Sequence, residues 1–88
     1  MRHQNHPEIL KRLRRANGHL RTIITMIEAE EPCLQISQQL EAVEKAILNA
    51  KKALIHDHID HCIEQSFRAS GSKGRAALRE FRAITRYL

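Results

Sequence analysis

Apolar side chains recur every three or four residues through most of the chain, which is the spacing of one face of an α-helix. The first such stretch is predicted to run from Pro7 to Glu30. Its apolar positions are Ile9, Leu13, Ala16, Leu20, Ile23 and Ile27. Pro7 suits the first helical turn, and Glu8 complements the positive end of the helix dipole. Gly18 interrupts the stretch at a cost of about 1 kcal/mol relative to alanine, unless it permits close helix packing.

A second and longer helix is predicted from Cys33 to Phe67. It follows a break at Glu31-Pro32, because the residue before a proline disfavours helical backbone. Its apolar positions alternate steps of four and three residues: Ile36, Leu40, Val43, Ile47, Ala50 and Leu54. Such a seam is typical of a coiled coil and requires a partner helix along its whole length.

A loop at Ala69–Gly74 and a short third helix at Arg75–Tyr87 complete the predicted elements. The apolar side of this helix comprises Ala76, Leu78, Phe81, Ile84 and Leu88. The fold class is therefore all-α, a helical hairpin with a short C-terminal helix. One helix of the same chain cannot cover the long seam, so we expect two chains to form an antiparallel four-helix-bundle dimer.

The composition fits one small domain over residues 1–88, in which residues 1–6 are expected to be a flexible arm. The net charge of +5 favours nucleic acid or an anionic membrane surface as partner. No apolar run approaches the ~20 residues of a membrane span, and the N-terminus lacks the apolar segment of a secretory signal. We therefore expect a cytoplasmic protein without a membrane partner, where two cysteines are more typical of ligands or redox sensors than of a disulfide.

Metal-ligating residue types gather at the two ends of the predicted second helix, with Cys33 at its start and His56, His58, His61 and Cys62 near its end. A continuous helix separates the two cysteines by about 43 Å, at ~1.5 Å per residue. At ~100° per residue, however, His58 and Cys62 each lie within about 20° of the direction of Cys33. In an antiparallel dimer, Cys33 of one chain would meet His58 and Cys62 of the other, which gives two equivalent sites.

Two thiolates and one imidazole favour a soft or borderline ion: Cu(I), Zn(II), or Ni(II) with extra nitrogen donors. Three ligands suit trigonal Cu(I), whereas structural zinc normally takes four. His3, His6 and His61 are possible additional ligands, the first two if the arm folds back, and His56 is assigned to the surface. An enzyme that uses cysteine and histidine is disfavoured, because the helix separates Cys33 from His58 and no oxyanion motif is visible.

Basic residues concentrate in an acid-free stretch of the first helix. The candidate DNA-contacting residues are Lys11, Arg12, Arg14, Arg15, Arg21, Lys51 and Lys52. They disfavour a metal carrier that does not bind DNA. No helix-turn-helix or zinc-finger pattern is visible, and aromatic residues for stacking on single strands are scarce. We expect phosphate contacts to double-stranded DNA with shape readout. A second stripe, whose role the sequence leaves open, comprises Arg75, Arg79, Arg82 and Arg86.

The chain resembles the copper-sensitive operon repressor family, which also includes nickel/cobalt and formaldehyde sensors. The matching stretches are residues 12–20 (RLRRANGHL), Cys33, residues 38–43 (QQLEAV) and residues 56–62 (HDHIDHC). The resemblance implies dimers that pair into tetramers, and repression of metal-efflux or detoxification genes until an effector releases the operator. By position, Cys33, His58 and Cys62 match the copper-sensing triad. Arg12 matches a DNA-contacting arginine, and Glu80 falls near an acid that couples the metal site to the third helix.

Departures from the family pattern bear on the effector. Nickel-type members add an N-terminal histidine, whose position here is Met1, two residues from His3. Formaldehyde-type members use a proline where this chain has Arg2, which disfavours that chemistry. The implied function is thus a Cu(I)-responsive repressor, neither an enzyme nor a binder of a small-molecule substrate. The alternatives are a Ni(II)/Co(II)-responsive repressor, or a persulfide or thiol-redox sensor that uses Cys33 and Cys62.

Overall fold

Three α-helices make up the structure, a computed structural model that describes residues 6–68 and 71–88. They are α1 (His6–Glu28), α2 (Cys33–Arg68) and α3 (Ser72–Thr85), and no strand occurs in the described ranges. The all-α, three-helix prediction is confirmed. None of these helices is long and apolar enough to cross a bilayer, as far as the described residues extend.

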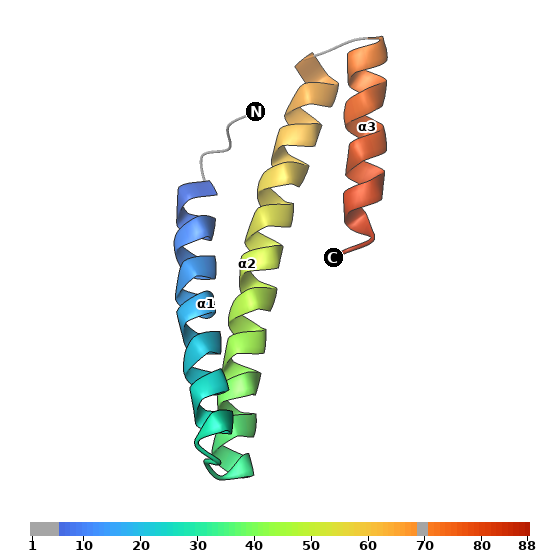
Figure 1. The fold of residues 1–88 in the computed structure, drawn as a ribbon. Helices are drawn as coiled ribbons and strands as arrows, with labels where there is room; N and C mark the ends of the chain where they lie inside the picture. The colour runs from blue at the N-terminus through green and yellow to red at the C-terminus, as the bar shows by residue number, and fades with distance from the viewer. Residues whose placement is uncertain (1–5, 69–70) are drawn as a thin grey trace.

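The helices lie in a single elongated layer (Figure 1). α1 runs antiparallel beside the first part of α2, and α3 packs beside its last part, again antiparallel. The extents are 58 × 23 × 14 Å and the radius of gyration is 17.9 Å. A compact domain of this length would have a radius of gyration of about 12 Å. The protomer therefore encloses little interior of its own.

The hairpin of α1 and α2 has a narrow core in which Ala16, Ile23 and Val43 are buried and Ile36 packs against them. These residues form one side of the predicted apolar seams. The other side keeps between 36% and 53% of its surface exposed and comprises Leu13, Leu20, Ile27, Leu40 and Ile47. Packing within the protomer thus satisfies half of the apolar pattern and leaves the other half open.

The turn between α1 and α2 is a Schellman motif. The N–H of Glu31 donates to the carbonyl oxygen of Met26 over 3.0 Å, and the N–H of Glu30 donates to that of Ile27, also over 3.0 Å. Glu30 has a φ of 57°, in the left-handed region. α1 therefore ends at Glu28, two residues earlier than the sequence predicts.

The predicted start of the third helix is wrong by three residues. Gly71, with a φ of 66°, makes the turn, and the N–H of Arg75 donates to its carbonyl oxygen over 3.2 Å. Ser72, Lys73 and Gly74 were expected in the loop but form the first turn of α3. Gly74 is buried within this turn. Ala69 and Ser70, also assigned to the loop, lie outside the described residues.

The buried side of α3 also differs from the prediction. Ala77 is buried and Ala76 is exposed, because the contact with α2 follows the three- and four-residue spacing that begins at Gly74. Phe81 and Ile84 are half-buried, as expected for that side. The other two predicted apolar positions are largely exposed, Leu78 by 48% and Leu88 by 65%.

Candidate metal centre and nucleic-acid interface

The candidate metal ligands lie at opposite ends of α2. Cys33 is its first residue and is exposed, whereas His58 is half-buried and Cys62 is 2% exposed near the other end. Because α2 is unbroken from Cys33 to Arg68, the two cysteines are about 43 Å apart along its axis. Among the described residues, no three metal-ligating side chains surround a common point within the protomer. The three cannot meet in one chain.

The three candidate ligands share a side of α2 with the exposed apolar residues. At ~100° per residue, Leu40 and Ile47 lie within about 40° of the direction of Cys33, as His58 and Cys62 also do. Leu40 and Ile47 are 43% and 41% exposed, respectively. The exposed apolar residues and the candidate ligands therefore share a side of α2, on which Cys33 is exposed and Cys62 is already buried within the protomer.

Cys62 is held in apolar surroundings between α2 and α3. A small cavity of about 60 Å³ beside it is lined by Ile63, Leu78 and Phe81. Burial raises the pKa of the Cys62 thiol above its ordinary value of 9.0, and the negative charge of Glu80 raises it further. At neutral pH the thiol keeps its proton, so a metal ion that binds there must displace it.

Glu80 brings α3 into contact with the candidate ligands. Its Oε1 lies 3.7 Å from Nδ1 of His58, within ion-pair distance if the imidazole is protonated. A cavity of about 510 Å³ opens beside this pair between α2 and α3. Its lining comprises Lys51, Leu54, Ile55, His58, Glu80, Ile84 and Tyr87. One carboxylate therefore lies beside His58 and also raises the pKa of Cys62.

His6 is the first residue of α1 and lies beside the same end of α2. Its Nε2 is 3.8 Å from Oδ2 of Asp57, and its ring centroid is 6.2 Å from that of His58. The sequence had placed His6 in the arm, whereas the structure includes it in α1. His61 is half-buried on α2, and His3 lies outside the described residues.

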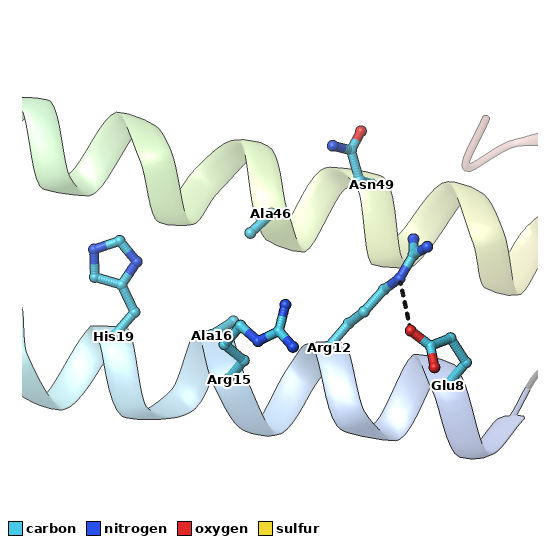
Figure 2. Close-up of a pocket in the computed structure, with 7 residues that line it drawn as sticks. All are labelled: Glu8, Arg12, Arg15, Ala16, His19, Ala46 and Asn49. Atoms are coloured by element: carbon cyan, nitrogen blue, oxygen red, sulfur yellow. Dashed lines mark ion pairs between the residues drawn. The ribbon is translucent and has the colours of Figure 1, made fainter.

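The predicted DNA-contacting residues differ in their surroundings, because some line a groove or cavity and others do not. Figure 2 shows Arg12 and Arg15 reaching from α1 toward α2 at a groove of about 470 Å³. Its other lining residues are Glu8, Ala16, His19, Ala46 and Asn49. Nε of Arg12 lies 3.9 Å from Oε1 of Glu8. Lys51 instead lines the cavity beside His58. The other four are exposed outside both cavities: Lys11, Arg14, Arg21 and Lys52.

One polar contact at this groove was missed by sequence reasoning. Nε2 of His19 donates to Oε1 of Gln39 over 2.6 Å and so ties α1 to α2. Arg12, Arg15 and His19 follow one another at steps of three and four residues, which places them on one side of α1. That spacing was the signal that could have grouped them and separated them from Arg14.

Comparison with known proteins places the chain among regulators. The metal-sensitive transcriptional repressor family matches residues 5–86. The copper-sensing repressor CsoR of Mycobacterium ulcerans (strain Agy99) is 35% identical over 71 residues, which cover 81% of this chain and 59% of the relative. The copper-sensing repressor RicR of Mycobacterium tuberculosis (strain H37Rv) is 33% identical over 70 residues, which cover 80% and 73%. This chain spans less than two thirds of the length of the CsoR relatives.

Among solved structures, the nickel-responsive transcriptional regulator InrS matches with a TM-score of 0.81 and 25% identity, over 100% of this chain and 98% of InrS. The fold agreement therefore extends over all three helices. The family consists of transcriptional repressors rather than enzymes, as the sequence predicted. The chain belongs to the metal-sensitive transcriptional repressor family.

Proposed function

We propose that this protein is a Cu(I)-responsive repressor that binds double-stranded operator DNA in the metal-free state and releases it when Cu(I) binds. Metal-efflux or resistance genes, transcribed in the cytoplasm, are then derepressed. The observation that supports this most is that Cys33, His58 and Cys62 lie on one side of α2, within about 40° of one another. Cys33 is exposed there, whereas His58 is half-buried and Cys62 is buried. The copper-sensing relatives favour Cu(I) as the effector.

In this proposal, two protomers pair antiparallel through their exposed apolar sides. Burying a large aliphatic side chain completely contributes roughly 1.5–3 kcal/mol, so even half-exposed residues such as Leu20 and Leu40 add substantially when several are covered. Ile47 lies near the midpoint between Cys33 and Cys62 and therefore near the two-fold axis. Each Cys33 then faces His58 and Cys62 of the partner, and two such dimers form the tetramer that the family resemblance implies.

The donor set fits a soft monovalent ion. Cys33 and Cys62 would hold Cu(I) as thiolates and His58 as an imidazole, and a soft ion prefers such ligands. Cys62 would release its proton to solvent on binding the ion, and the raised pKa of its thiol makes metal affinity increase with pH. Glu80 lies beside the His58 ring and holds its orientation, as carboxylates near metal-bound imidazoles commonly do.

Release of DNA requires the metal to bind one conformation more tightly than the other. Typical coupling free energies of this kind are ~1–3 kcal/mol. Arg12 and Arg15 provide phosphate contacts at the groove of Figure 2. The contacts of His6 and Glu80 beside His58 join both α1 and α3 to the metal-binding end of α2. A rearrangement at this end therefore reaches the helix that bears the groove arginines.

The test is a Cys33→Ala variant assayed on duplex DNA from the region upstream of the chain's own gene. We expect this variant to bind the duplex like the wild type and to stay bound when Cu(I) is added anaerobically. Ser37→Ala is the matched control, because Ser37 lies beside Cys33 with 3.9 Å between Sγ and Oγ. If Cu(I) releases DNA from Cys33→Ala as it does from the wild type, the proposed metal site is wrong. If the wild type does not bind the duplex at low salt, the proposed repressor function is wrong.

A Ni(II)- or Co(II)-responsive repressor is the second candidate, and the position of His6 favours it. Two imidazoles bound to one ion at about 2 Å each have ring centres no more than about 6.3 Å apart, the value reached when they lie on opposite sides of the ion. The observed 6.2 Å between His6 and His58 is close to that limit. If Ni(II) is the effector, His6→Ala will lower Ni(II) affinity and leave Cu(I) affinity unchanged in anaerobic titrations. His3→Ala, measured alongside, tests the other arm histidine.

A persulfide or thiol-redox sensor is the remaining alternative. It requires reactive thiolates at Cys33 and Cys62. Because the pKa of Cys62 is raised, little of this thiol is present as the reactive thiolate at neutral pH. We therefore favour metal sensing over the redox function. A persulfide donor that releases DNA from the wild type while Cu(I) does not would reverse that order.

A further inference from the structure

α3 has two chemically different sides. The side that packs on α2 comprises Gly74, Ala77, Phe81 and Ile84, which are buried or half-buried. The opposite side comprises Arg75, Arg79, Arg82 and Arg86, all of them exposed. At ~100° per residue these four arginines lie within about 60° of one another, and at ~1.5 Å per residue they extend over about 16 Å. We refer to them as the α3 arginine stripe.

The stripe has no acidic neighbour on its own helix that could neutralise it. The single acid of α3 is Glu80, and its carboxylate lies against His58 on α2. The ion pairs found within the described residues involve other partners, and none of them joins a stripe arginine to a carboxylate. Positive charge thus accumulates on a surface of α3 that α2 does not cover.

All four stripe residues are arginine, and this residue type indicates the ligand. The guanidinium is planar and presents paired N–H groups that match two oxygens of a phosphate. Duplex DNA carries one phosphate per ~3.4 Å of axis on each strand, so a stripe of about 16 Å can reach several of them. An outward row of arginines on a small repressor therefore has the length and chemistry for the DNA backbone.

We propose that the α3 arginine stripe binds backbone phosphates of duplex DNA, in addition to the groove arginines of α1. The proposal rests on the repressor function and deepens it by assigning a second DNA contact. It gives α3 a contact on each side, with Glu80 against His58 on the inner side and phosphates on the outer side. DNA contact and metal ligands are then separated by the width of one helix.

The experiment measures DNA affinity of the metal-free protein as a function of salt, by fluorescence anisotropy with a labelled duplex from upstream of its own gene. The variant is Arg79→Gln/Arg82→Gln, because glutamine removes the charges and retains good helix propensity. Each lost phosphate contact lowers the slope of log K against log salt by about 0.9. We expect the slope to fall by about 2 and the affinity at low salt to fall at least tenfold.

Lys45→Gln is the matched control, since Lys45 is exposed on α2, pairs with Glu41 and belongs to no proposed DNA contact. It is expected to leave slope and affinity unchanged, and wild-type Cu(I) stoichiometry in the double variant will show that it is folded. If the double variant binds DNA like Lys45→Gln while the wild type binds well, the stripe proposal fails and the repressor proposal survives. A double variant that instead dissociates into monomers would assign the stripe to the subunit interface and also overturn the proposal.

Discussion

At the scale of single residues, the buried thiol of Cys62 makes stability depend on pH. Its pKa is raised in the folded protein by burial and by Glu80, so the folded state holds this proton more tightly than the unfolded chain. The resulting stability is complete below the ordinary value of 9.0 and is lost as pH rises through the folded pKa. We expect the free energy of unfolding of the metal-free protein to fall above pH 9.

Urea unfolding at a series of pH values, on reduced and metal-free protein, measures this effect. The informative quantity is the difference in free energy of unfolding between the wild type and Cys62→Ser, because the other groups are common to both proteins. That difference should shrink as pH rises above 9. Glu80→Gln lowers the folded pKa of Cys62, so it should make the loss smaller and complete it at a lower pH. If the difference stays constant across this pH range, folding does not raise the pKa of Cys62.

At the scale of helices, spacing predicted the elements well and their ends less well. α1 and α2 were predictable because a three- and four-residue repeat extends through both. The start of α3 was missed because Ser72, Lys73 and Gly74 have the composition of a turn, although they are helical and the turn before them is at Gly71. Gly18 was left open by the sequence. A Cβ there would meet no atom within 4 Å, so packing within the protomer does not require this glycine.

The end of α1 gives a prediction at this scale. Glu30 occupies the left-handed position of the Schellman motif with a φ of 57°, where a residue with a Cβ is strained by roughly 1–2 kcal/mol. Glycine relieves this strain but also raises the conformational entropy of the unfolded chain, which offsets part of the gain. We therefore expect Glu30→Gly to stabilise the protein by about 0.5–1 kcal/mol. Thermal unfolding measures the change.

Glu28→Gly is the control for this prediction, since Glu28 is the last residue of α1 and has ordinary helical backbone. Glycine at that position should destabilise the protein by up to ~1 kcal/mol. Opposite signs at positions two residues apart would assign the effect to backbone conformation rather than to the loss of a carboxylate. If both substitutions change stability in the same direction, the assignment to backbone conformation is wrong.

At the scale of the molecule, helix geometry made part of the candidate site predictable. The common side of Cys33, His58 and Cys62 follows from their spacing on one unbroken helix. The approach of His6 to His58 could not be predicted, because it depends on the register that the turn sets between α1 and α2. The split between groove arginines and other basic residues depends on which side of α1 meets α2. To predict these two features, one needs the contacts between helices, which the residue types alone do not give.

Two variants that each lack a ligand provide the sharpest test of the shared site. Cys33→Ala retains His58 and Cys62, and Cys62→Ala retains Cys33 and His58, so neither forms a complete site with its own copies. A mixed dimer has one complete site, made from Cys33 of one chain and His58 and Cys62 of the other. Random pairing of an equal mixture makes about half of the dimers mixed, and one of their two sites is complete. The refolded mixture should therefore recover about a quarter of the wild-type high-affinity sites.

Anaerobic Cu(I) titration against a chromophoric chelator counts these sites, in the mixture and in each variant alone. The control is Cys33→Ala mixed with a chain that lacks both cysteines, because no pairing of those two chains assembles a complete site. Recovery only in the first mixture requires ligands from two protomers, as the separation of about 43 Å along α2 demands. A site built within one chain would recover nothing in either mixture, since every chain lacks a ligand, and that result would exclude the antiparallel dimer as the sensor.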